Sequence, residues 1–383
     1  MPTTTVGKFA TYDSSFLDEK VIDLAMLVEP RITTTWDLIP EIEAKSEGEM
    51  STKVKWYDAQ PNSLEGAVRA TGWNNSDLTG LPIDDALASV VNIGDIIEVG
   101  TEQLIVSAVV RTGGSATISV LARGHGSTSP ATHSASDPIY IIGNANVEGT
   151  VDGSSIIEDN VLRQNYFQLI EEVVEVTKTG KNQSYEDVQS KLNEMRVRAL
   201  SRALRKMNMT ALFGVADAGS ASAPRTCAGI REFLSGNSDA INTNCSGTFT
   251  EPLLKTTLLE IAKRGGTPNL ILCSPEQKNV INGFNTTNTR YAREEKVAGN
   301  LVDFYEGEGV GRLAVVSDPL LRDAFGEMYI LNTNKMGKMW FPDDAMRFAE
   351  EPANSRTIKE TLQGQFTLKF KDTETDFARL YNT

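Results

Sequence analysis

The longest helical pattern in the chain constrains the fold more than any other feature. Ser184-Tyr-Glu-Asp187 resembles a capping box, and apolar residues then follow one helical face as far as Phe213, directly before Gly214. These apolar residues are Val188, Leu192, Met195, Ala199, Ala203 and Leu204. At roughly 1.5 Å per residue, a helix over 184–213 would be about 45 Å long. That length is unusual for a compact domain in a chain of 383 residues.

The opposite face of this helix is basic. It carries six basic residues against three acidic ones, in a chain whose formal net charge is -14. The basic residues are Lys191, Arg196, Arg198, Arg202, Arg205 and Lys206. The face either contacts nucleic acid or pairs with carboxylates of the same chain or of its neighbours. We favour pairing, because phosphate binding normally requires a larger excess of positive charge.

Residues 81–145 have a composition of their own. They contain no lysine and two arginines, and short β-rich runs are separated by turn residues every 8–12 positions. This spacing predicts a small all-β barrel or sandwich inserted into the chain. His125 and His133 lie in its Gly/Ser-rich stretch 123–137, which we expect to be a surface loop. The stretch adds only Asp137 as a further metal ligand, so both histidines are expected to be polar loop residues.

Two segments have an extended or ambiguous pattern. From Met50 to Tyr57 the residues alternate with period two, as in a strand that is polar on one side. Residues 161–178 fit helical spacing, yet Val173–Thr177 is β-branched and nearly alternating, so helix and strand both remain open. The first 45 residues are acidic and have no core of their own, which predicts an arm that lies on another surface.

The second half of the chain alternates helices and strands. The pattern predicts a helix from Glu251 to Arg264, a stop at Gly265-Gly266, a buried strand over Leu270–Cys273 and a helix over Pro275–Phe284. The stretch from Gly309 to Ala314 fits a dinucleotide-binding motif, but a strand follows it, so we expect a hairpin turn. Residues 361–370 again alternate as a strand. The chain is therefore predicted to have a mixed α+β fold.

The sequence has few resources for catalysis. It lacks a GxSxG nucleophile motif and a P-loop, and its adjacent carboxylates point apart on a helix or strand. Cys227, Cys245 and Cys273 have no CxxC spacing and are expected to be free thiols. No apolar run approaches the roughly 20 residues of a membrane helix. We expect no catalytic residue, no metal ligand, no cofactor and no membrane.

A two-stranded arm is at best marginally stable alone, so it must find a partner surface. An arm, a long hairpin and a long helix in one chain suggest a subunit that interlocks with copies of itself. Aromatic residues at 36, 56, 57 and 73 serve either as core or as interface anchors, and we weigh the two equally.

The order of these segments resembles the major capsid proteins of tailed double-stranded-DNA bacteriophages, which have the Hong-Kong-97-like fold. The stretches that carry the resemblance are Ile39–Lys45, Val54–Tyr57, Arg163–Ile170, Val174–Thr177, the helix Tyr185–Phe213 and the run Leu258–Lys278. The segment Val120–His133 is similar to a small β module that recurs in phage structural proteins. The resemblance implies that Tyr166–Thr177 is a strand.

The resemblance also implies a division of the chain. Residues 1–45 would be the N-terminal arm, 46–80 with 146–178 the extended loop and its return strand, and 81–145 an inserted β-rich domain. Residues 179–250, with the spine helix 184–213, would form the peripheral domain. Residues 251–333 would form the axial domain, and 334–383 the closing strands of the peripheral domain.

The implied function is that of a shell subunit. Copies of the chain would form the hexamers and pentamers of an icosahedral virion shell around packaged double-stranded DNA, assembled in the host cytoplasm. Separate scaffolding, portal and decoration proteins would be further partners, contact with DNA would be non-specific, and no Lys–Asn crosslink is expected. The candidate interface residues are Trp36, Lys53, Lys55, Trp56, Tyr57, Arg198, Arg202 and Arg205.

Two alternatives remain open from the sequence. The first is an α/β hydrolase with a β accessory domain, using two carboxyl groups about 5–10 Å apart. The second is a phage-like compartment that encloses enzyme cargo instead of DNA.

Overall fold

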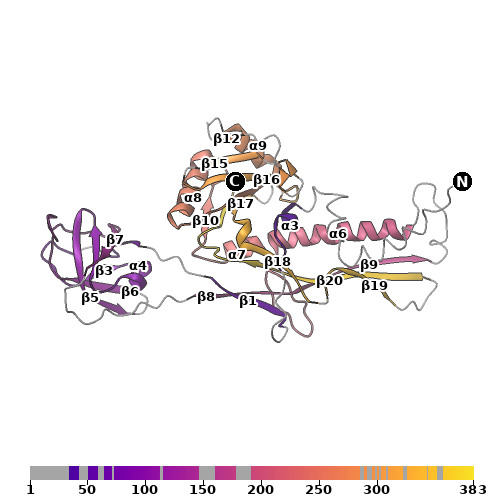
Figure 1. The fold of residues 1–383 in the computed structure, drawn as a ribbon, viewed down its shortest axis with the longest axis horizontal. Helices are drawn as coiled ribbons and strands as arrows, with labels where there is room; N and C mark the ends of the chain where they lie inside the picture. Colours follow the sequence, from indigo (N-terminus) through magenta and orange to yellow (C-terminus); the bar gives the residue numbers. More distant parts are fainter. Residues whose placement is uncertain are drawn as a thin grey trace. The chain divides into compact units, whose positions relative to one another are not determined.

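The computed structural model divides the chain into two compact units. The body consists of Met1–Asp58 and Val161–Thr383, and the barrel unit consists of Ala59–Asn160 (Figure 1). The structure describes residues 34–42, 51–58, 64–70, 73–112, 115–145, 160–177, 191–284, 289–290, 296–297, 300–301, 303–307, 309–321, 326–342, 344–351 and 357–383. The expected helix start at Ser184 and most of the expected arm lie outside these residues.

A long helix, α6, covers one face of a four-stranded sheet in the body (Figure 1). Its bounds are Lys191–Phe213, and the strands are β9 (Gln168–Thr177), β18 (Met336–Trp340), β19 (Arg347–Glu351) and β20 (Thr357–Phe370). The apolar side of α6 is buried as the sequence pattern predicts, and Leu204 packs in one core with Ile170 and Phe366. The long helix is therefore held by tertiary packing along its length.

Two strands form an antiparallel ribbon beside this sheet. They are β1 (Lys53–Asp58) and β8 (Val161–Tyr166), paired from Lys53 with Tyr166 to Asp58 with Val161. The ambiguous stretch is thus β8 followed by β9, which confirms a strand. Its helical spacing fails because Asn165 and Val174 face inward while Leu162 and Val173 face outward, with period two on each strand.

The second half of the body is built on a seven-stranded sheet. Its order is β10 (Ile241–Asn244), β21 (Ala378–Tyr381), β17 (Glu327–Leu331), β11 (Leu270–Cys273), β16 (Gly311–Ser317), β15 (Asp303–Gly307) and β12 (Thr289–Arg290). Helices α8 (Glu251–Lys263) and α9 (Pro275–Gly283) pack on one face, and residues of α6 and α7 (Ile230–Ser235) share a core with the other face. Every residue of β11 is buried, because the strand is covered on both faces.

The local predictions for this region are confirmed. Helix α8, strand β11 and helix α9 lie within one residue of their expected bounds, and Ser274 and Gln277 form a capping box at the start of α9. Strands β15 and β16 are antiparallel and meet at Gly307 and Gly311, which is the expected hairpin. Short elements complete the body: β13 (Lys296–Val297), β14 (Asn300–Leu301) and η2 (Thr333–Lys335).

The seven-stranded sheet extends beyond the expected axial domain, residues 251–333, at both ends. Strand β10, expected in the peripheral domain, and strand β21, expected among its closing strands, both belong to the seven-stranded sheet. After β20 the chain reverses through a turn in which Asp372 has a φ of 54°. Ala378 and Leu380 then enter the core beside Ile271, which draws the end of the chain into this sheet.

The barrel unit is a closed six-stranded sheet. Its order is β2 (Glu65–Ala67), β7 (Pro138–Asn144), β4 (Asp95–Val99), β5 (Glu102–Thr112), β6 (Ser115–Val120) and β3 (Leu81–Ile83), with a helix α4 (Asp85–Val90). A bridge between Val68 and Ile83 joins the two outer strands and closes the barrel. The unit is wider than the expected 81–145, because β2 completes the barrel and Val68 and Trp73 fill its core.

Candidate functional site

The exposed side chains of β1 and β8 lie on the outer face of the ribbon. This face consists of Lys53, Lys55 and Tyr57 on β1 with Leu162, Gln164 and Tyr166 on β8. Tyr57 and Leu162 lie directly opposite each other, and they are 64% and 48% exposed. A cross-strand apolar pair stabilises a sheet, and covering its exposed surface with another molecule would add the free energy of burying apolar area.

Trp56 points the other way, into the body. Its indole Nε1 donates a hydrogen bond to the Phe370 carbonyl oxygen at 3.1 Å, and its ring lies 5.7 Å from that of Phe233. Of the expected interface residues on β1, Trp56 is therefore a core residue, while Lys53, Lys55 and Tyr57 stay on the outer face.

Trp36 is also a core residue, which corrects its assignment to an arm. It lies on a short helix, α3 (Thr34–Leu38), and is fully buried. Its backbone N–H donates to Asn208 Oδ1 at 2.7 Å, and Lys338 Nζ donates to its carbonyl oxygen at 3.1 Å. Asp318 accepts the backbone N–H of Thr35 at 3.1 Å. Distant parts of the body thus fix residues 34–38.

The basic face of α6 is paired within the chain. Arg196 forms a bidentate pair with Glu360, with both nitrogen–oxygen distances at 2.6 Å. Arg202 Nε lies 3.2 Å from Glu172 Oε2 on β9, and Lys206 binds the same carboxylate. Burial opposes ionisation of Glu172, but hydrogen bonds from Lys206 and Arg202 outweigh it and lower the pKa of Glu172. This is the pairing expected from the sequence, made with β9 and β20 of the same chain.

Arg198 and Arg205, the other two interface candidates on α6, are exposed. Their exposure leaves them accessible to a second molecule.

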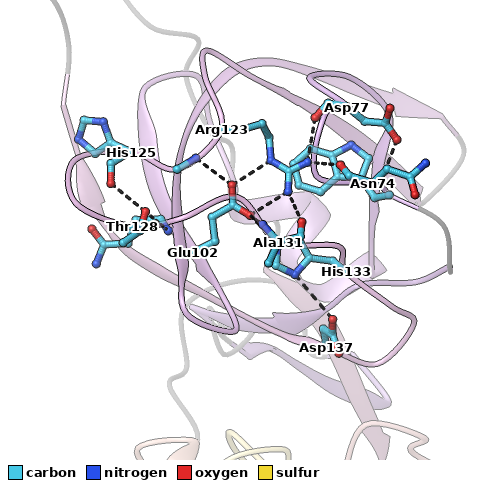
Figure 2. Close-up of polar contacts among 12 residues, drawn as sticks. Asn74, Asp77, Glu102, Arg123, His125, Thr128, Ala131, His133 and Asp137 are labelled. Atoms are coloured by element: carbon cyan, nitrogen blue, oxygen red, sulfur yellow. Dashed lines mark hydrogen bonds and ion pairs between the residues drawn. The ribbon is translucent and has the colours of Figure 1, made fainter.

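The barrel unit contains a buried ion-pair cluster around Glu102 (Figure 2). Arg123 donates from Nε and Nη2 to the two carboxylate oxygens at 2.9 and 2.8 Å. The backbone N–H groups of Gly124 and Ala131 donate to the same carboxylate at 2.8 and 2.9 Å, and His133 Nε2 lies 2.9 Å from Oε2. One fully buried carboxylate therefore holds both ends of the 123–133 loop.

Trp73 completes this cluster. The Arg123 guanidinium lies 3.9 Å from the centre of its indole ring, and the His133 ring stacks on it at 5.8 Å. Burial opposes ionisation of Glu102, yet the hydrogen bonds from Arg123, Ala131, His133 and Gly124 lower its pKa to about 2. His125 is exposed, as expected for a surface loop, but the expected surface position is wrong for His133, which is 3% exposed. No short-range pattern could reveal this, since Glu102 is 31 residues away.

The described residues include no group of three or more His, Cys, Asp or Glu side chains arranged to hold a metal ion. Among the same residues, no helix combines the length and apolarity needed to cross a membrane. The three cysteines are free and buried, and burial raises the pKa of Cys227 to about 11.

A family model described as SU10 major capsid protein matches residues 2–383. A match over practically the whole chain defines the class as a viral capsid protein that forms a multi-copy shell and resides in the virion. The chain belongs to the SU10 major capsid protein family. This structural role favours the shell hypothesis over the hydrolase. No curated protein matches the sequence.

Solved structures of capsids and of an encapsulin are similar to the chain at low identity. A structure of Mycobacterium phage Cain is 11% identical, covers 91% of this chain and 89% of its own, and has a TM-score of 0.45. The cyanophage A-1(L) capsid is 15% identical, with coverages of 63% and 85% and a TM-score of 0.47. The holo-SrpI encapsulin of Synechococcus elongatus PCC 7942 is 13% identical, with coverages of 59% and 78% and a TM-score of 0.43. Because these TM-scores are below 0.5, the assignment rests on the family model.

Proposed function

We propose that copies of this chain form the hexamers and pentamers of an icosahedral shell around packaged double-stranded DNA, assembled in the host cytoplasm. In this proposal α6 is the spine of a peripheral domain, the seven-stranded sheet is the axial domain at capsomer centres, and the barrel unit is an insertion in the extended loop. Membership of a major capsid protein family over residues 2–383 supports the proposal.

The observation that carries it on this chain is the exposed cross-strand pair of Tyr57 and Leu162. A ribbon of two strands has little stability of its own. An apolar pair at its outer face therefore favours contact with a second copy, and the neighbouring Lys53 and Lys55 would form the polar rim of that contact.

The test compares particle formation by variants of the full chain. Tyr57→Glu should prevent closed shells, because it places a charge in the proposed contact, while Tyr57→Phe should assemble as the parent does. Val110→Glu, at a residue of the barrel unit that is 59% exposed, is the matched control. Sedimentation and negative-stain electron microscopy measure the outcome. Normal shells from folded Tyr57→Glu would refute this contact without refuting shell formation.

The contents of native particles test the DNA part of the proposal. The basic side chains of α6 at 196, 202 and 206 share two carboxylates, Glu172 and Glu360, which leaves one net positive charge, so contact with DNA should be non-specific and weak. Nuclease-protected double-stranded DNA in purified particles would support a genome-containing shell. A protein cargo without DNA would favour the compartment alternative. Co-purification from infected cells tests for separate scaffolding, portal and decoration partners.

A further inference from the structure

Four carboxylates crowd the end of the ribbon where the barrel unit is attached. Asp58 is the last residue of β1 and is 4% exposed. Nearby, the 371–376 turn between β20 and β21 carries Asp372, Glu374 and Asp376. These four carboxylates lie where three elements of the body meet: the ribbon, the four-stranded sheet and the seven-stranded sheet.

Two cations, Lys335 and Arg163, lie among the four carboxylates. Both bind Asp372, Glu374 or Asp376 more closely than they bind Asp58. Lys335 Nζ lies 2.8 Å from Asp372 Oδ2 and 2.7 Å from Asp376 Oδ2. Arg163 Nη2 lies 2.6 Å from Glu374 Oε1, which also accepts a hydrogen bond from Asn237 at 3.0 Å. The Nε of Arg163 is 3.7 Å from Asp58 Oδ2, beyond hydrogen-bond distance.

Two carboxylate oxygens in this group are left over. Oδ1 of Asp58 and Oδ1 of Asp372 are both buried, and neither has a hydrogen-bond partner among the described residues. The Nε donor of Arg163, 3.7 Å from the other oxygen of Asp58, is also buried and has no hydrogen-bond partner in the described part of the chain, so this ion pair is incomplete on both sides. Burying an acceptor without a donor costs free energy, and burying it as a charge costs more. A proton on Asp58 removes one negative charge from this group.

A metal ion is less well supported than a proton. The described residues contain no set of three ligating side chains arranged for a metal, and that includes these four carboxylates. Proton binding requires only one neutral carboxyl group next to an ionised one.

We propose that Asp58 is a proton-binding site that controls how firmly the end of the ribbon is held to the 371–376 turn. With a proton on Asp58, the carboxyl group is neutral and the ribbon end stays docked. Without the proton, a buried carboxylate faces Asp372 and Glu374, and the end of β1 opens more readily.

The direction of the titration agrees with this geometry. Burial raises the pKa of Asp58 above its ordinary 3.8, and the charges of Asp372 and Glu374 add to the rise, while a backbone N–H of Asp372 and Arg163 oppose it. A folded-state pKa above the unfolded value contributes stability that is complete below 3.8 and is lost as pH rises through the folded value. Burial opposes ionisation of Asp376, but hydrogen bonds from Lys335, the Thr267 backbone N–H and Asn332 outweigh it and lower its pKa, so the stability that Asp376 contributes is lost as the pH falls. Docking of the ribbon end should therefore be firmer in mild acid than at neutral pH.

Hydrogen–deuterium exchange on the unassembled full chain tests the proposal. Peptides covering Lys53–Asp58 and residues 371–376 are compared in mildly acidic and neutral buffer, after correction for intrinsic exchange rates. When the buffer is changed from mildly acidic to neutral, protection should fall by about tenfold for each unit by which the folded pKa of Asp58 exceeds its ordinary value. Asp58→Asn should stay protected at both pH values, and the exposed control Asp217→Asn should behave as the parent.

Three results would overturn the proposal: no pH dependence in the parent chain, an unchanged pH dependence in Asp58→Asn, or protection that rises with added Ca²⁺ or Mg²⁺ only when Asp58 is present. If Asp58→Asn does not fold, Asp372→Asn serves instead. It removes one of the repelling charges, so the transition should move to lower pH. Because the readout is local opening in single chains, the outcome is independent of shell formation.

Discussion

Glu102 carries more of the barrel unit's organisation than any residue described in that unit. Replacing it with Gln would leave the Arg123 guanidinium buried without its counter-ion. Because the amide keeps only one of the two oxygens, one of the two loop N–H groups would also lose its acceptor. We expect Glu102→Gln to lower the free energy of unfolding of this unit by about 3–5 kcal/mol. Denaturant titration, followed by exchange in barrel-unit peptides, measures this loss. Glu98→Gln on the adjacent strand is the control and should change stability little.

The lowered pKa of Glu102 predicts the pH below which the barrel unit loses stability. The folded pKa of this carboxyl group is about 2 and lies below the ordinary 4.5, so the stability that the group contributes is present above 4.5 and is lost as pH falls toward 2. Unfolding of the barrel unit at decreasing pH should therefore begin only below 4.5. Glu102→Gln should remove this pH dependence, and an equally steep acid transition in the variant would contradict the assignment.

Residue-scale predictions from sequence failed wherever a distant partner decides burial. The sequence favours core and interface equally for Trp36, and contacts with Asn208, Asp318 and Lys338 place it in the core. His125 and His133 share one loop and one composition, yet only His133 meets Glu102. Such contacts join residues far apart in the chain, and no periodic pattern encodes them.

At the scale of elements, α6 packs on β9 through buried apolar side chains, and basic side chains of α6 pair with Glu172 of β9 at the edge of this contact. Arg202 is 53% exposed, so its pair with Glu172 should contribute less than about 1 kcal/mol to folding. Arg202→Glu loses this pair and brings a second carboxylate toward Glu172, so it should lower the free energy of unfolding by roughly 1 kcal/mol, whereas Arg198→Glu on the same helix should change it little. Thermal unfolding checks both variants.

Particle assays then separate folding from assembly for these arginines. If either folded variant fails to form shells, that arginine contacts a second copy. A large loss of stability in Arg202→Glu would contradict the view that its pair with Glu172 is a weak surface interaction.

Helices and strands with a regular spacing of apolar residues could be predicted from the sequence, but the strands with which they pair could not. The alternation of Lys53–Tyr57 and the helix–strand–helix run from Glu251 agree with the structure, because each depends on local spacing. The stretch at 161–177 satisfied two periods, and only pairing with β1 and β20 selects the strand. Similarly, β10 and β21 are too short to show which sheet they join.

At the scale of the whole molecule, the register of the ribbon predicts that the barrel unit can be removed. Asp58 and Val161 are paired neighbours on adjacent strands, so a two-residue Asn-Gly turn can connect them directly. A chain lacking residues 59–160 should keep the body fold, with its thermal transition preserved and that of the barrel unit lost. Differential scanning calorimetry measures both. Loss of the body transition would show that the two units depend on each other for folding.

Closure of the barrel by Val68 and Ile83 has a consequence for a protein present in many copies. Open sheet edges recruit strands from other chains, and this hazard grows when identical chains are crowded together. The strands of the barrel unit pair in a closed ring, and the bridge satisfies the edge that β2 and β3 would otherwise expose. The barrel unit can therefore be repeated at high local concentration without offering its copies a template for amyloid-like growth.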